Sequence, residues 1–225
     1  MCGEPARRGG AGIRPARLRT AGCAAPVVLV LAGTLAAGCG GPPPGQRLCD
    51  AIAKNDVVQA QQALADRHLD LGKLEGVPCR VLESVFGRAK TADTALTQIG
   101  LEMVKAGLPA NASWTSGKQV WAVEAAARNG NTELVRALMA VGLDASGEEA
   151  ERALRAAAAA GQLEVVKMLV GAGVAPEGDG STQAPVMLAT TNGHAEVATF
   201  LADAIEGRAR AAAAAKAGDG AEPPK

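Results

Sequence analysis

Apolar residues recur with helical spacing through much of the chain. Two stripes of large apolar residues have members three or four positions apart: Leu134, Val135, Leu138 and Met139, and Val165, Val166, Leu169 and Val170. Such spacing places the members of a stripe on one face of a helix. Each stripe follows an alanine-rich stretch and a glycine, so the pattern predicts pairs of short helices separated by a tight turn.

The helix pairs recur with a period of 31 to 32 residues. Three stretches superpose, at 123–144, 154–175 and 186–201, and their turn glycines are Gly130, Gly161 and Gly193. Glycine suits this position because it adopts the left-handed conformation that ends a helix within one residue. One unit is too small to bury both of its helices, so we expect the units to stack.

These units resemble the ankyrin repeat. The resemblance rests on an apolar residue, paired alanines, the glycine, a Glu-Val-Val segment and a second apolar stretch that ends in glycine, as in residues 154–173. A unit at 48–64, with Asn55 at the glycine position, fits an N-terminal cap, and another unit is expected at 77–111. The resemblance implies an all-α ankyrin-repeat solenoid of about five stacked helix-turn-helix repeats with hairpin-like loops, over residues 47–206.

Composition agrees with a helical protein. Of 225 residues 50 are alanine, whereas Phe, Trp and Tyr together make up 2%. β-Sandwiches and barrels favour aromatic and β-branched residues, and platforms for single-stranded nucleic acid need aromatic rings, so the composition argues against both. The segment 207–225 is expected to be an alanine-rich, partly disordered tail.

The N-terminal region has the pattern of an export signal. Residues 1–20 carry five arginines and one acidic residue, and 24–37 are apolar and uncharged, too short to span a membrane. Leu35-Ala-Ala-Gly-Cys39 resembles the bacterial lipobox, in which the cysteine becomes the lipid-carrying N-terminus. This implies a signal peptide over 1–38, lipid such as palmitate on Cys39 and a Gly/Pro tether over 39–46. The alternative is an ordinary signal peptide with a cysteine near its end.

Removal of that signal changes the charge of the chain. The whole sequence has 23 basic and 23 acidic residues, whereas residues 39–225 keep 18 and 22, a net charge of −4. Nucleic acid is therefore not an expected partner, because its binding relies on clustered Lys and Arg. The lipobox resemblance implies the cell envelope, and Gly rather than Asp at position 40 implies the outer membrane, facing the periplasm.

Two further cysteines, Cys49 and Cys79, remain after the signal is removed. Export places them in an oxidising compartment, and both fall near the start of a first helix in neighbouring repeats. They form either a disulfide, which would close a loop of about 30 residues and stabilise by about 3 to 4 kcal/mol, or two buried free thiols.

Patterns for catalysis were not found. His68 and His194 are the only histidines, and neither has a metal ligand at a recognisable spacing. No Gly-x-Ser-x-Gly is present, and Ser116-Gly-Lys-Gln119 lacks the hydroxyl residue of a phosphate loop. We expect no cofactor, no metal ion and no enzymatic activity.

The ankyrin resemblance implies that a partner protein binds the exposed side of the first helices and the loops. The implied helix positions are Ala125, Arg128 and Asn129, then Ala156, Ala159 and Ala160, then Leu188, Thr191 and Asn192. In the loop 108–120 the candidates are Trp114 and Lys118, while Trp121 either joins them or packs beneath the loop. The alanines at 156–160 form either a shallow floor for a partner or helix-favouring filler.

These observations favour a monomeric, non-catalytic protein-protein interaction module that lipid holds at the envelope. Within this class it is either a scaffold or an immunity-type inhibitor that covers the active site of a periplasmic toxin or enzyme. Two alternatives of other classes stay open: an enzyme or ligand-binding protein with an unrecognised site, and a cytosolic ankyrin protein whose start codon is misassigned.

Overall fold

The computed structural model describes residues 41–71, 80–90, 93–178 and 183–218, with side chains as far as 215. Contacts divide the chain into Met1–Cys39 and Gly40–Lys225, and the second unit contains all the described residues. The predicted signal peptide over residues 1–38, Cys39 and Cys79 lie outside the described residues.

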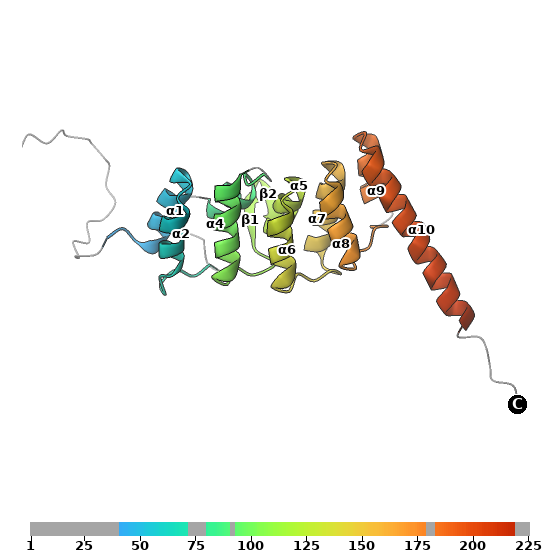
Figure 1. Cartoon of the computed structure of the whole chain (residues 1–225), viewed down its shortest axis with the longest axis horizontal. Coiled ribbons are helices and arrows are strands. Elements are labelled where there is room, and N and C mark those ends of the chain that lie inside the picture. Colours follow the sequence, from blue (N-terminus) through green and yellow to red (C-terminus); the bar gives the residue numbers. More distant parts are fainter. Residues whose placement is uncertain (1–40, 72–79, 91–92, 179–182, 219–225) are drawn as a thin grey trace, which may run out of the picture. The chain divides into compact units, whose positions relative to one another are not determined.

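Ten helices of the described ranges form consecutive pairs (Figure 1). The pairs are α1 (Pro44–Lys54) with α2 (Val57–Leu64), α3 (Val81–Phe86) with α4 (Thr94–Lys105), α5 (Ala122–Arg128) with α6 (Thr132–Ala140), α7 (Glu148–Ala159) with α8 (Leu163–Gly171), and α9 (Pro185–Thr191) with α10 (Ala195–Gly218). Each first helix packs against the next first helix, and each second helix against the next second helix. The predicted solenoid of stacked helix pairs is therefore confirmed.

Small residues fill the layer of first helices. Ala126 and Ala127 of α5 and Ala157 and Ala158 of α7 are fully buried. Larger side chains occupy the inner face of the second helices: Leu134, Val135 and Leu138 in α6, and Val165, Val166 and Leu169 in α8. The two stripes predicted from the sequence are thus core stripes, although Met139 and Val170 are only partly buried.

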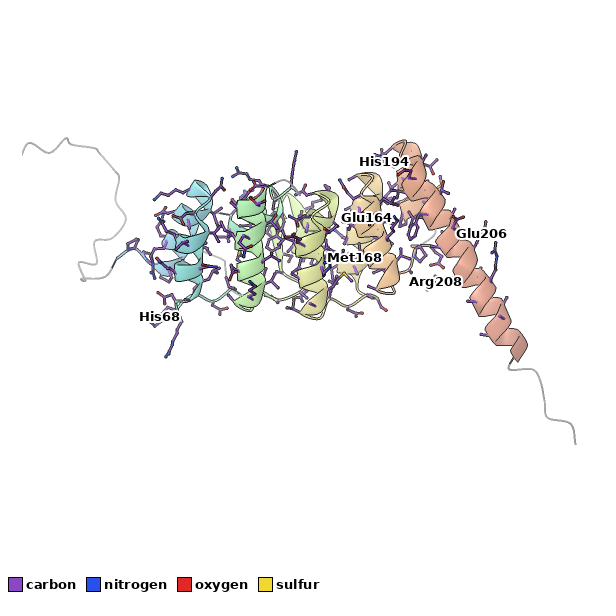
Figure 2. The ribbon with its side chains drawn as sticks, in the orientation of Figure 1. His68, Glu164, Met168, His194, Glu206 and Arg208 are labelled. Atoms are coloured by element: carbon purple, nitrogen blue, oxygen red, sulfur yellow. The ribbon has the colours of Figure 1, made fainter. Side chains whose placement is uncertain are left out.

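In the last three pairs, the turn is linked to the pair before it. The residue after each turn glycine reaches back: Asn131 Nδ2 donates to Thr97 Oγ1 at 2.6 Å, and Gln162 Nε2 donates to the Arg128 carbonyl at 3.4 Å. His194 Nε2 lies 3.1 Å from the Ala159 carbonyl, and Figure 2 shows this side chain at the turn between α9 and α10. The last carbonyls of a helix have no partner within it, so two of these contacts complete the preceding first helix.

The turn glycines adopt the conformation that the sequence predicts. Gly130, Gly161 and Gly193 have φ of 73°, 72° and 80°. Asn55, which stands at the glycine position of the first pair, has φ of 54°. Gly161 also lies against the turn of the next helix pair, since a Cβ at this position would be 2.5 Å from His194 Nδ1. A Cβ on Gly193 would instead meet nothing within 4 Å.

Residues 108–120 contain regular structure where a loop was expected. Strands β1 (Ser113–Ser116) and β2 (Lys118–Trp121) pair antiparallel, with Ser116 opposite Lys118. Gly117, at φ of 79°, forms the tip. The fold prediction included hairpin-like loops, but it assigned no strands here, because these strands are short and mostly polar, a pattern that periodicity does not separate from a loop.

The ends of the helical array differ from the predicted boundaries. Helix α1 begins at Pro44, inside the expected 39–46 tether, because proline suits the first position of a helix. Helix α10 continues to Gly218, inside the expected 207–225 tail, since its alanine run has a high helix propensity.

Cys49 is buried in α1 at 7% exposure and is disulfide-bonded. Its predicted partner, Cys79, lies outside the described residues, so the pairing of these two cysteines stays a prediction.

Substitution of the turn glycines should separate backbone strain from contact with the next pair. Gly193→Ala should cost about 1 to 2 kcal/mol of unfolding free energy, from the left-handed conformation alone. Gly161→Ala should cost about 1 kcal/mol more, because the His194 ring must move and its contact with the Ala159 carbonyl is lost. Urea unfolding of both variants measures the difference, and equal losses would contradict a role for the inter-repeat contact.

Candidate partner-binding surface

Two neighbouring hollows lie along the first helices. One, of about 520 Å³, is lined by α3, the hairpin and α5, and is called here the α3–α5 hollow. The other, of about 560 Å³, is lined by β2, α5, α7 and the α9 region, and is called the α5–α9 hollow. Arg128 lines both, so the two hollows adjoin, and together we call them the binding face.

The hairpin forms one wall of the α3–α5 hollow. Trp114 of β1 is half-buried against the core and lines the hollow opposite Asn129 and Arg128 of α5. The hairpin is also held to α3, because Ser116 Oγ donates to Glu83 Oε1 at 3.3 Å. Glu83 in turn pairs with Arg80 at 3.0 Å. A network of polar contacts therefore fixes the tryptophan-bearing strand beside α3.

Asn129 has a structural role as well as a place in the hollow. Its Nδ2 donates to the carbonyls of Phe86 and Gly87, at 3.0 and 3.1 Å. Asn192 makes the matching contact between α9 and α7: at the end of α9, its Nδ2 donates to the Ala159 carbonyl of α7 at 2.9 Å. Both asparagines precede a turn glycine, and both complete the end of the preceding first helix.

An ion pair with a buried carboxylate lies where the two hollows adjoin. Glu124 is 5% exposed and its Oε1 accepts a hydrogen bond from Arg128, one helical turn later. Its Oε2 is buried and has no hydrogen-bond partner among the described residues. The Glu124 carboxylate therefore depends on Arg128 for its compensating charge.

Trp121, the last residue of β2, is buried and lines neither hollow. The side chain is 8% exposed, and the Arg152 guanidinium carbon lies 4.6 Å from its ring centroid. This is a cation–π distance, and Arg152 also pairs with Glu148 at 2.8 Å. Arg152 is thereby held at the edge of the α5–α9 hollow, which it lines.

Alanines form the apolar part of the α5–α9 hollow. Ala156, Ala159 and Ala160 of α7 line it together with Leu188 of α9. Lys118, Arg152 and Arg155 line the same hollow with positive charge. Because alanine has no atoms beyond Cβ, this part of the surface allows a partner backbone to approach closely.

Five of the seven partner-binding residues predicted from the sequence line these hollows: Trp114, Lys118, Arg128, Asn129 and Leu188. Thr191 and Asn192 are exposed but line neither. The predicted positions Ala125, Ala156, Ala159 and Ala160 also line them. Whether any of these residues binds a partner stays a prediction.

Sequence reasoning missed several charged residues of the binding face. Arg152 and Arg155 precede Gly161 by nine and six positions, as Trp121 and Glu124 precede Gly130. The repeat register, extended one turn upstream, would have indicated them. Arg80 and Arg88 lie beside α3, where no register was available because that unit is only partly similar to the others.

The described carboxylates with displaced pKa lie away from the binding face. The backbone N–H of His68, followed by the Arg47 side chain, lowers the pKa of Asp66. A hydrogen bond from Lys105 lowers the pKa of Glu102. Neither residue lines either hollow, so these shifts reflect surface ion pairs and capping contacts.

The described ranges contain neither a cluster of metal ligands nor a membrane-spanning helix. His68 and His194 lie far apart (Figure 2), and no three His, Cys, Asp or Glu residues of these ranges gather as a metal site. Among the same residues, no helix has the length and apolar character needed to cross a membrane.

Comparison with known proteins identifies part of the array. Residues 121–211 match the family described as ankyrin repeats, with three copies. The match spans α5 to α9 and most of α10, and it covers the three repeats that superpose in the sequence. No curated protein matches the chain.

The Glu124–Arg128 pair is open to a direct test. Arg128→Met should lower the free energy of unfolding by about 1 to 3 kcal/mol, because it leaves the buried carboxylate without its donor. Adding Glu124→Gln should restore part of this loss, since a neutral amide is less costly to bury than a charge. Urea unfolding of the single and double variants decides; a double variant less stable than Arg128→Met would rule out this account.

Proposed function

We propose, from the premise that residues 121–211 form ankyrin repeats, that the chain is a non-catalytic module that binds a protein partner at the cell envelope. Ankyrin repeats indicate a protein-protein interaction module. The proposal goes further: it assigns the contact to the binding face and assigns the anchor to lipid on Cys39.

The composition and extent of the binding face support a protein as the ligand. Its two adjoining hollows run across three successive first helices and continue to Leu188 on a fourth. Half-buried Trp114 and several arginines lie on it, and these residue types are enriched at the energetic centres of protein interfaces. The proposal rests mainly on one observation: Trp114, several arginines and the alanines at 156, 159 and 160 line the same face.

The export signal supports the location. A basic segment, an apolar stretch and Leu35-Ala-Ala-Gly-Cys39 follow one another in the order of a lipoprotein precursor. We propose a monomer whose acylated Cys39 holds it at the outer membrane, facing the periplasm. Several acyl chains on one cysteine would make this attachment firm, at about 0.8 kcal/mol for each buried methylene.

Lipid attachment can be tested in cells that express the full chain. Cys39→Ser should abolish metabolic labelling with palmitate and move the protein from the membrane fraction to the soluble fraction. Cys23→Ser is the matched control, because Cys23 would leave with the signal peptide, and it should keep both label and location. Label that persists in Cys39→Ser would exclude this anchor.

Partner binding is tested by crosslinking and pull-down from intact envelopes, followed by affinity measurement with the purified partner. Trp114→Ala should weaken binding about tenfold, equivalent to about 1.4 kcal/mol, as expected for an interface tryptophan. Val141→Ala serves as control, because Val141 is 47% exposed at the end of α6 and lines neither hollow. Equal affinity of both variants would remove Trp114 from the interface, and a partner enzyme inhibited on binding would identify an inhibitor rather than a scaffold.

A further inference from the structure

Charge is distributed unevenly between the binding face and the rest of the protein. Residues 39–225 carry a net charge of −4. The two hollows are nevertheless lined by six basic residues, Arg80, Arg88, Lys118, Arg128, Arg152 and Arg155. Their acidic lining residues are two, Glu83 and Glu124. The binding face is therefore a basic patch on a segment, residues 39–225, that is acidic in total.

The two glutamates of this patch are already compensated. Glu83 pairs with Arg80 at 3.0 Å, and Glu124 accepts a hydrogen bond from Arg128. Beyond these two pairs, Arg88, Lys118 and Arg152 carry positive charge on the face. Arg152 shares its charge with Glu148, which lies outside the lining of both hollows.

Arg88 and Lys118 are the most available of these charges. Both side chains are exposed, and neither forms an ion pair with a carboxylate of the described residues. Lys118 is the first residue of β2 and lines the α5–α9 hollow. Arg88 follows α3 in the sequence and lines the α3–α5 hollow. Excess positive charge therefore occurs on both sides of Arg128.

We propose that the binding face recognises an acidic segment of the partner protein, which lies across both hollows with its carboxylates near Arg88, Lys118 and Arg152. The inference rests on the proposed function and specifies the chemistry of the partner. The alanine floor of α7 admits the backbone of the segment, and Leu188 offers contact to one of its apolar side chains.

Electrostatic screening allows an acidic protein to bind an acidic segment in this way. At physiological ionic strength the screening length is about 8 Å, so distant carboxylates of the chain contribute little repulsion. Charges in contact across an interface are screened less, and complementary potentials there favour encounter and select the partner. For the attraction of a bound segment, the local charges of the binding face therefore matter more than the net charge of the protein.

A defined peptide tests the charge preference. The probe is a fluorescein-labelled 12-residue peptide, Glu-Glu-Leu-Ala repeated three times, with a matched peptide in which glutamine replaces glutamate. Fluorescence anisotropy at low salt should show at least about tenfold tighter binding of the acidic peptide, with the advantage shrinking as salt rises. Equal affinity for the two peptides would overturn the proposal.

Paired charge-removal variants test the location. Arg88→Gln with Lys118→Gln should weaken acidic-peptide binding by about fivefold or more, and neither substitution breaks an ion pair of the described residues. The control, Arg136→Gln with Lys167→Gln, removes the same charge from α6 and α8 and should change affinity by less than about twofold. An equal loss in both would show an effect of net charge and overturn the assignment to this face.

Two further readouts complete the test. An excess of a 12-nucleotide thymidine oligonucleotide should not displace the peptide. If the oligonucleotide binds more tightly than the peptide, the ligand of this face is nucleic acid and the proposal is wrong. In the envelope pull-down, undiminished capture by the Arg88→Gln, Lys118→Gln variant would refute the acidic-segment inference and leave the proposed function intact. No capture by the unmodified chain would instead count against the proposed function itself.

Discussion

Close packing between neighbouring first helices is the constraint on which the rest of the structure depends. The alanines that α5 and α7 turn toward the core are fully buried, and these two helices pack directly against each other. Alanine side chains end at Cβ, so the helix backbones lie near one another while the interior stays filled. The same short separation brings the turns of the last two pairs within hydrogen-bonding distance of the preceding first helix.

This packing also determines the character of the exposed side. First helices that carry small residues leave hollows between the longer side chains at their ends, and the hairpin before α5 adds a wall that holds Trp114. The Glu124–Arg128 pair stands between the hollows and places a guanidinium in both. The interaction surface is thus formed by the same helices that make the array close-packed.

Much of the array was predictable because each feature has a local cause. The apolar stripes follow from helix geometry, the repeat unit was predicted from internal similarity and the ankyrin resemblance, and Asn55 could be assigned because asparagine tolerates a left-handed backbone. The hairpin at 113–121 was missed because its short strands depend on contacts with α3 rather than on their own pattern. The basic patch was missed for a different reason: Arg88, Lys118 and Arg152 converge from separate repeats, whereas the charges sum to zero over the whole chain and to −4 over residues 39–225.

The hydrogen bonds between pairs give the array a direction. Gln162 and His194 each reach from a later turn to a carbonyl at the end of an earlier helix, and Asn129 and Asn192 do the same. Each unit is therefore completed by the one that follows it. Loss of a unit from the C-terminal side uncovers backbone carbonyls of its predecessor, whereas loss from the N-terminal side uncovers side-chain donors of the surviving turn. The two ends of the solenoid therefore expose different groups on truncation or fusion, although the units between them repeat.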